Sequence, residues 1–287
     1  MMTIDFRIRP PFKSFTQLNI FQGPFPCMDP RFDGYPAAHG RDYTPSYINT
    51  DMGKFMDEMD RAGIRLAVVM GRRTGNPKYG DVDNADIEEL CNLYPTRFVG
   101  FGGIDPHDPG AVEEVKKSAA RGFKGIAVDA GWCDPELMVD DDLLMPIYEE
   151  ATKQGLIASI TMSAFLGSTI NFSHPAALQR VANTFPELPI VVPHGCWPHV
   201  SEAFGVALMC PNVHLMPDTY FYVPKFPQVH DWIDACNSGF LKYKMLFASS
   251  YPIRGLEETV RNWKDLPFET DPLYHSLYYN AARLLKL

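Results

Sequence analysis

Short apolar runs alternate with amphipathic stretches along the whole chain. Eight of these runs have the length of buried strands and their content of Ile, Val and Phe. They span residues 3–8, 65–70, 97–104, 124–129, 157–162, 189–193, 212–216 and 244–248. Helical spacing of the apolar residues recurs near 51–62, 84–94, 109–120, 141–154, 174–185, 199–208, 227–238 and 255–264, and a last helix is expected over roughly 272–286.

This alternation predicts parallel strands that are joined by helical crossovers. Eight such units in 287 residues fit an α/β fold of the (β/α)8 (TIM) barrel type, as a single domain over residues 1–287. A doubly wound open sheet is the alternative, although it usually has fewer strands. Glycines support the predicted helix ends, because Gly63, Gly122 and Gly155 stand where a left-handed cap is wanted.

Residues 10–49 interrupt the pattern after the first strand. They show no clear periodicity and are rich in Pro, Gly and aromatic residues, which indicates a long insertion. Because loops that follow barrel strands build the active site, this insertion over the C-terminal face is a candidate lid or oligomer contact. A surface excursion without a role is an equal alternative.

The composition limits the compartment and the partners. Apolar residues make up 46% and charged residues 21% of the chain, which is enough for a sizeable core. A net charge of −9 without a basic stripe argues against nucleic acid as a partner. The six cysteines form no C-x-x-C pair, so we interpret them as free thiols in a reducing compartment. Without a signal-like start or a membrane-length apolar run, a cytoplasmic protein that binds no membrane is expected.

The ends of the predicted strands carry the most distinctive motifs. In chain order they read IDFRIRP, YPTRFVGFGGIDP, GFKGIAV, VVPHG, PNVHL and FASSYP, and YYNAARLL follows near the C-terminus. This set resembles the amidohydrolase-related family (amidohydrolase 2 type), in the branch with aminocarboxymuconate-semialdehyde decarboxylase, resorcylate decarboxylases and pyrone dicarboxylate lactonase. The resemblance runs from Ile4 to Leu285 and implies a distorted (β/α)8 barrel whose active site lies at the C-terminal ends of its strands.

The resemblance also implies where a metal would be held. The family's first strand usually reads I-D-x-H-x-H, and its two histidines correspond to Arg7 and Arg9. A histidine after the fifth strand corresponds to Thr161 and an aspartate after the eighth to Ser250, whereas His194 after the sixth is kept. A guanidinium offers only donors, and a tight divalent site needs three or four imidazole, thiolate or carboxylate ligands. The family's metal centre is therefore expected to be absent, and no cofactor is predicted.

Arg7 and Arg9 stand two apart on one strand, so both are expected to point into the barrel. Buried guanidiniums need negative partners. If the protein supplies them, Asp129 and Asp105 at strand ends are the candidates, and the arginines then only fill the place of a metal. If a ligand supplies them, the arginines form a clamp for a carboxylated substrate, to which Arg72 after the second strand would add.

The remaining polar side chains at strand ends supply candidate chemistry. His194 is the best candidate acid or base, because imidazole titrates near neutral pH, and a hydrogen-bonded core histidine is the alternative. Asp129 is a second candidate base. The other candidates are Ser250 as a catalytic hydroxyl, and Thr161, Trp132, Tyr251 and Arg254 as substrate-binding residues. Histidines elsewhere, including His214, are expected in loops or helices as structural or surface residues.

Three functions stay open at this point. The first is a metal-independent hydrolase or carboxy-lyase for a small carboxylated substrate, such as a lactone or cyclic acid, with an arginine clamp and with His194 and Asp129 handling protons. The second keeps a metal such as zinc or manganese on recruited ligands, and the third is a non-catalytic ligand-binding barrel. The expected partner is a small anionic substrate. The family implies a homodimer or homotetramer, for which residues 10–49 and the C-terminal tyrosines would suit an interface.

Overall fold

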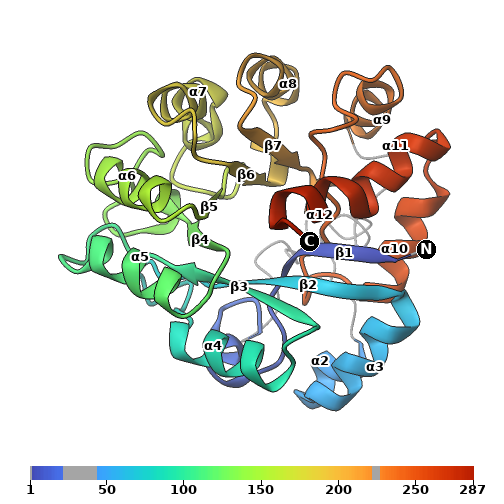
Figure 1. The fold of residues 1–287 in the computed structure, drawn as a ribbon, viewed down its shortest axis with the longest axis horizontal. Coiled ribbons are helices and arrows are strands. Elements are labelled where there is room, and N and C mark those ends of the chain that lie inside the picture. The colour runs from blue at the N-terminus through green and yellow to red at the C-terminus, as the bar shows by residue number, and fades with distance from the viewer. Residues whose placement is uncertain (1, 22–43, 222–226) are drawn as a thin grey trace.

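The computed structural model describes residues 2–21, 44–221 and 227–287. Seven parallel strands lie side by side in chain order and curl into a barrel wall (Figure 1). They are β1 (Thr3–Ile8), β2 (Ile64–Met70), β3 (Phe98–Gly103), β4 (Gly125–Val128), β5 (Ile157–Ile160), β6 (Ile190–Pro193) and β7 (Val213–Met216). All seven lie where the apolar pattern predicted a strand, and the α/β barrel is confirmed.

Two isolated bridges take the place of the eighth predicted strand. Leu215 of β7 pairs with Met245, and Ile8 of β1 pairs with Tyr251, both in parallel orientation. Further backbone hydrogen bonds join β1 to the same segment. The prediction over residues 244–248 was therefore right in position, because this segment connects β7 to β1, but wrong in expecting a regular strand.

Helices cover the outer face of the barrel wall (Figure 1). They are α3 (Met52–Ala62), α4 (Asn84–Leu93), α5 (Ala111–Ala120), α6 (Met145–Lys153), α7 (Pro175–Thr184), α8 (Val200–Met209), α9 (Val229–Asn237) and α10 (Leu256–Asp265). The last predicted helix is α11 (Thr270–Tyr274), a π-helical turn (His275–Tyr279) and α12 (Asn280–Leu285). No helix of the described ranges combines the length and the apolar character that a membrane crossing requires.

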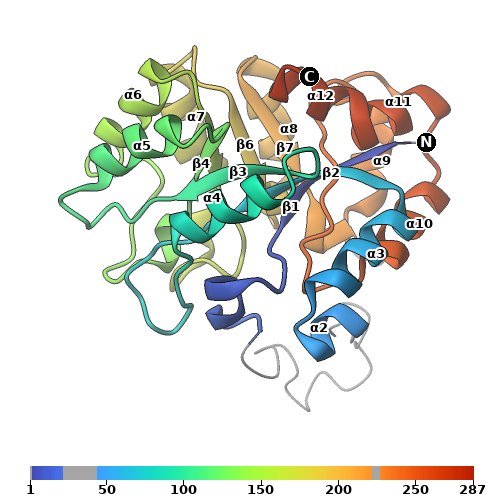
Figure 2. The same cartoon turned by 60° about the horizontal axis from the view of Figure 1, so that its bottom comes forward.

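Only the two ends of the predicted insertion fall within the described residues. The short helices η1 (Lys13–Gln17) and α2 (Pro45–Asn49) lie there. Figure 2 shows both on the side of the barrel toward which β1 runs. Residues 22–43 are outside the described residues, so the role of the insertion stays a prediction.

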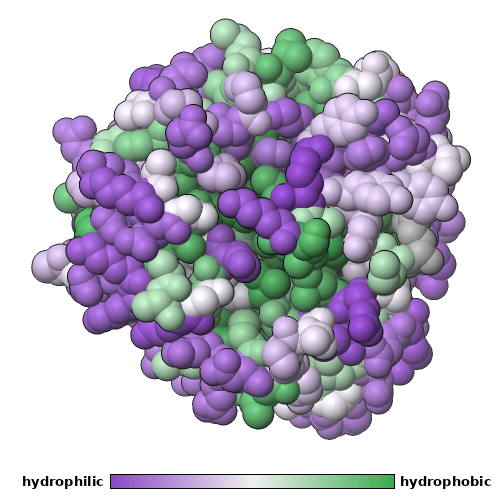
Figure 3. Space-filling model, viewed as in Figure 1, coloured by the Kyte–Doolittle hydropathy of each residue, from purple (hydrophilic) through white to green (hydrophobic). Residues whose placement is uncertain are grey.

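One layer of the barrel interior is apolar. It is a buried cluster of Ile4, Phe6, Val68, Met70, Phe101, Ala127, Ile157, Val191, Met216, Leu246 and Ala248, closed by Ala281 and Leu285 of α12. Phe6 and Phe101 pack edge to face, with ring centroids 5.8 Å apart. Figure 3 views the end that α12 covers, where hydrophilic side chains surround apolar ones near the centre. This layer therefore lies toward the ends at which the strands begin.

An irregularity in β1 brings its arginines inward. Phe6 faces the apolar interior, so regular alternation would place Arg7 on the outer face of the strand. The pairing with β2 shifts its register between Asp5 and Ile8, and such irregularities re-aim side chains. Arg7 and Arg9 are buried and contact residues that follow β4 and β7. Both point inward as expected, although not by strict alternation along the strand.

Candidate active site

Five charged side chains gather where the barrel strands end. Arg7 and Arg9 come from β1 and the residue after it, Arg72 follows β2, and Asp129 and Asp218 follow β4 and β7. Each of the five is at most 4% exposed. The active sites of barrel enzymes lie at this end. Within the part of the chain that the structure describes, three guanidiniums face two carboxylates in this cluster, which is an excess of positive charge.

Asp218 stands between Arg7 and His194. Nη1 of Arg7 lies 3.3 Å from Oδ2 of Asp218 and donates a hydrogen bond of 3.0 Å to Oγ of Ser250. Nδ1 of His194 lies 2.7 Å from the other carboxylate oxygen, Oδ1. Burial lowers the pKa of His194, although the carboxylate of Asp218 opposes that shift. The imidazole is therefore neutral at pH 7.

Asp129 is held by the other two arginines. Nε of Arg72 donates to Oδ2 of Asp129 at 3.3 Å, and Nη2 of Arg9 lies 3.7 Å from the same oxygen. Burial alone would raise the pKa of Asp129, but Arg72 and Arg9 lower it below its usual value, and the Thr161 hydroxyl acts in the same direction. Asp129 is thus an ionised partner of guanidiniums, which makes it a weak proton acceptor.

Trp132 packs against the side chain of Arg72. The guanidinium of Arg72 lies over the indole ring, 4.1 Å from its centroid, and the ring of Tyr79 stacks on the same indole at 5.3 Å. The indole Nε1 donates to the backbone oxygen of Phe165 at 2.8 Å. Asn19 accepts a hydrogen bond of 3.3 Å from Nη1 of Arg72. Trp132 therefore helps to hold the buried Arg72 in place through a cation–π contact.

Tyr251 lies away from this cluster. Its ring packs against Phe55 with centroids 4.7 Å apart, and its hydroxyl lies 2.7 Å from Oγ of Ser46. The expected contact with substrate is not supported by this position, because the side chain fills the space beside α2 and α3. Arg254 is half-buried in the segment before α10, and its substrate role stays a prediction.

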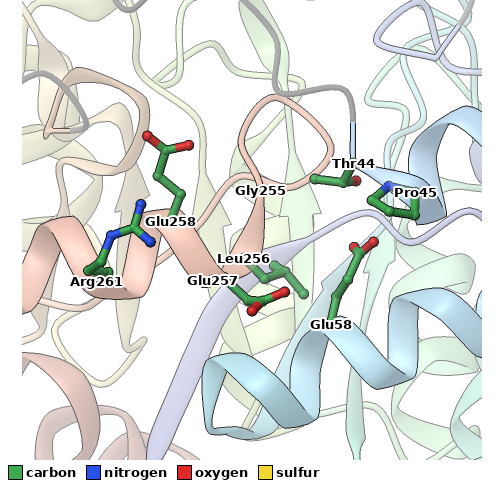
Figure 4. Close-up of a pocket in the computed structure, with 8 residues that line it drawn as sticks. All are labelled: Thr44, Pro45, Glu58, Gly255, Leu256, Glu257, Glu258 and Arg261. Carbon is green, nitrogen blue, oxygen red and sulfur yellow. The ribbon is translucent and has the colours of Figure 1, made fainter.

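A cavity of about 270 Å³ opens between α3 and α10 (Figure 4). Glu58 from α3 and Glu257 from α10 are among its lining residues. The carboxylate of Glu58 accepts hydrogen bonds from the backbone N and the Oγ of Ser46, so it is already occupied. None of the three clustered arginines lines this cavity, and the charged residues that do line it are Glu58, Glu257, Glu258 and Arg261.

Two predicted partners are corrected by the structure. Asp105 was a candidate partner of the arginines, but its Oδ1 accepts from the backbone N of His107 at 2.9 Å and closes a local turn. Asp129 was expected to handle protons together with His194, but the carboxylate that contacts His194 belongs to Asp218. The sequence reasoning missed Asp218. Its signal was its place two residues after the end of β7, the kind of position from which barrels recruit active-site groups.

His214 also differs from expectation. It lies within β7 rather than in a loop or helix, and it is 7% exposed. Burial lowers its pKa to about 3, with Lys244 and Arg283 acting in the same direction. His214 is therefore a neutral histidine of the barrel wall, which agrees with the structural role expected for it.

The donor set does not fit the metal centre that the family's pattern implies. Within residues 2–21, 44–221 and 227–287, no group of three His, Cys, Asp or Glu side chains is placed to hold a metal ion. The carboxylates of Asp129 and Asp218 face guanidiniums, which repel a cation.

The sequence matches the family described as Amidohydrolase over residues 36–287. The chain belongs to the amidohydrolase family. Among solved structures, this amidohydrolase-family chain is similar to an uncharacterised TIM-barrel protein from Bordetella bronchiseptica. The two are 31% identical with a TM-score of 0.88, over 100% of this chain and 99% of that one. No protein of curated function matches the chain.

Two decarboxylases share the fold at lower identity. The 5-carboxyvanillate decarboxylase from Sphingomonas paucimobilis is 16% identical with a TM-score of 0.65, over 100% of this chain and 99% of that one. The 2,6-dihydroxybenzoate decarboxylase from Rhizobium is 16% identical with a TM-score of 0.66, over the same shares. At this identity the likeness shows the fold alone. Family membership supports an activity of the hydrolase or lyase type.

Proposed function

We propose that this amidohydrolase-family barrel is a hydrolase or carboxy-lyase for a small carboxylated substrate and works without the family's metal centre. The observation that carries the proposal is the burial of Arg7, Arg9 and Arg72, which among the described residues form ion pairs with two carboxylates, those of Asp129 and Asp218. Burial and the neighbouring guanidiniums lower the pKa of Arg9, as expected for a cation short of negative charge. An anionic ligand would supply the missing charge.

Arg7 supplies a second argument for an anion. Its Nε is buried and has no hydrogen-bond partner among the described residues. An unsatisfied buried donor on a charged group is costly, so a partner from outside the chain would be strongly favoured. A planar carboxylate suits the guanidinium fork.

His194 is the group that would move a proton, because it is neutral at pH 7 and lies beside the arginines. In the hydrolysis of a lactone, its imidazole would take a proton from the attacking water while a guanidinium stabilises the oxyanion. In a decarboxylation, the neutral imidazole would first take up a proton from water, and the resulting imidazolium would give that proton to the carbon from which CO2 departs. Ser250, bonded to Arg7, would contact a substrate held there. The two decarboxylases of similar fold support cyclic acids as the first compounds to test.

A non-catalytic ligand-binding barrel is the second candidate. The observation in its favour concerns Asp129, the second candidate base. Although burial alone would raise its pKa, Arg72 and Arg9 lower it below its usual value, so Asp129 is a poor proton acceptor while the arginines can still hold an anion. Binding without turnover would support this second candidate.

The test is a thermal-shift and calorimetric screen of small mono- and dicarboxylates and lactones, followed by mass spectrometry of every compound that binds. Arg7→Met should abolish binding. Arg73→Met is the matched control, because Arg73 adjoins Arg72 but lies 35% exposed near Asp108. If no carboxylate binds the wild type, the clamp is refuted. Stoichiometric zinc or manganese that His194→Ala removes would refute metal independence.

A further inference from the structure

The candidate acid–base residue, His194, contacts the carboxylate of Asp218, and the same carboxylate also faces Arg7. Oδ1 of Asp218 lies 2.7 Å from Nδ1 of His194, and Oδ2 lies 3.3 Å from Nη1 of Arg7. Asp218 is fully buried, and His194 is 5% exposed. Both residues adopt a positive φ, 68° for His194 and 32° for Asp218. Non-glycine residues are held in this region only where surrounding structure requires it, typically at functional sites.

We infer that Asp218 is the positioning residue of His194: its carboxylate accepts the Nδ1 proton and leaves Nε2 as the atom that exchanges a proton with the substrate. The inference rests on the proposed function in one respect, which is that a substrate exists to exchange a proton with Nε2. An ionised carboxylate accepts hydrogen bonds and donates none, and the other oxygen of Asp218, Oδ2, faces the guanidinium of Arg7. A neutral imidazole beside it is therefore stabilised with its proton on Nδ1.

The ring is fixed by packing as well as by charge. Tyr220 lies edge-on to His194 with ring centroids 5.8 Å apart, and Trp197 stacks on Tyr220 at 4.6 Å. The Tyr220 hydroxyl lies 2.8 Å from Oγ of Ser163. The Nδ1–H direction is not fully aligned with the Asp218 oxygen, as is common for catalytic hydrogen bonds before substrate binds.

Asp218→Asn gives a directional test. Arg7 can donate only to the amide oxygen, so the amide NH2 would turn toward Nδ1 of His194. Nδ1 would then have to accept, and the proton of the neutral ring would move to Nε2. The analogous carboxylate-to-amide change in a Ser-His-Asp triad gives the wrong tautomer and lowers kcat about 10⁴-fold. We expect a loss of at least about 10²-fold in kcat here, with little change in KM.

The experiment is long-range ¹H–¹⁵N NMR on the full chain labelled with ¹⁵N-histidine, which distinguishes the two tautomers. His194→Gln assigns the signal. The wild type should show the Nδ1–H tautomer and Asp218→Asn the Nε2–H tautomer. Asp129→Asn is the matched control. It also replaces a buried carboxylate that pairs with arginines, but this carboxylate is not the one that contacts His194, so the tautomer should stay unchanged.

The wild-type spectrum alone decides the inference if Asp218→Asn does not fold. An Nε2–H tautomer in the wild type, or no change on Asp218→Asn, would overturn it. These outcomes are independent of the carboxylate screen. If the protein binds a carboxylate but His194 carries its proton on Nε2, the proposed function stands and the positioning role of Asp218 is refuted. If His194 carries its proton on Nδ1 but the protein binds no carboxylate, the positioning role stands and the proposed function is refuted.

Discussion

The two ends of the barrel interior are lined by the same strands but by opposite kinds of side chain. Where the strands begin, Phe6 and Phe101 pack in an apolar cluster that α12 closes. Where they end, Arg7, Arg72 and Asp129 are equally buried but charged. Burial of apolar surface stabilises the fold, whereas a buried ion pair gains little over its desolvation cost. The apolar end is therefore expected to carry stability, and the charged end to carry ligand binding.

Removal of a large side chain from the apolar end should have the largest effect on stability. Phe101→Ala should lower the free energy of unfolding by about 3–5 kcal/mol, because it removes buried surface and leaves a cavity. Urea denaturation measures this change. Phe165→Ala is the control, since Phe165 is 42% exposed beside the charged end and should cost less than about 1 kcal/mol. Equal costs at the two sites would contradict the division of roles.

Asp5, in β1 just before Arg7, should make stability depend on pH. Burial raises its pKa to about 7, although hydrogen bonds from Ser249 partly oppose this, whereas the unfolded value is about 3.9. The folded state therefore keeps a proton that the unfolded state has lost, and the wild type loses stability as pH rises from about 4 to 7.

Asp5→Asn removes that proton equilibrium and keeps an oxygen that can accept from the backbone N of Ser249 and Arg7. The variant should match the wild type near pH 4 and be more stable above pH 7, by a few kcal/mol at most, on the order of 3. Urea unfolding from pH 4 to 8 tests this window. A difference that does not change with pH would show that Asp5 ionises normally in the folded protein.

At the charged end, Arg9→Met should weaken binding more than folding. We expect a loss of about 10- to 100-fold in affinity for any carboxylate found in the screen, since a hydrogen bond to a charged group contributes about 1.5–3 kcal/mol. Asp129 keeps its bond to Arg72, so the fold should persist. Calorimetry measures the affinity. Arg9→Lys keeps the positive charge but lacks the planar guanidinium fork, so its affinity should lie between those of the wild type and Arg9→Met. Unchanged affinity would remove Arg9 from the clamp.

The smallest effect is expected just outside the charged end. Arg73→Met should change the free energy of unfolding by less than about 0.5 kcal/mol, because a half-exposed ion pair contributes little. It should leave carboxylate affinity unchanged. If Arg73→Met weakened binding as much as Arg9→Met, the effect would come from overall positive charge and not from the buried cluster.

Local pattern predicted most of the architecture. The starts of β1 to β7 lie within one residue of the expected positions, and Gly63, Gly122 and Gly155 have the positive φ expected at helix ends. Strand periodicity and cap geometry depend on neighbouring residues, so they can be read along the chain. The conformation of residues 244–251, which close the barrel, was harder to predict, because their pairing depends on both β7 and β1.

By itself, the sequence determined the barrel and the end at which its polar side chains gather. The inward direction of Arg7 depends on the shift in register between β1 and β2, which regular alternation along the strand would not produce. Only the tertiary structure decided that Asp218, and not Asp129, meets His194. Apolar periodicity specifies where a strand lies and, where the strand is regular, the face on which a side chain lies. The pairing of charges across the barrel depends on the backbone conformation just past the strands, where His194 and Asp218 both adopt a positive φ. It also depends on the closure of the barrel, which brings residues far apart in the sequence together. Neither leaves a local signal in the order of the residues.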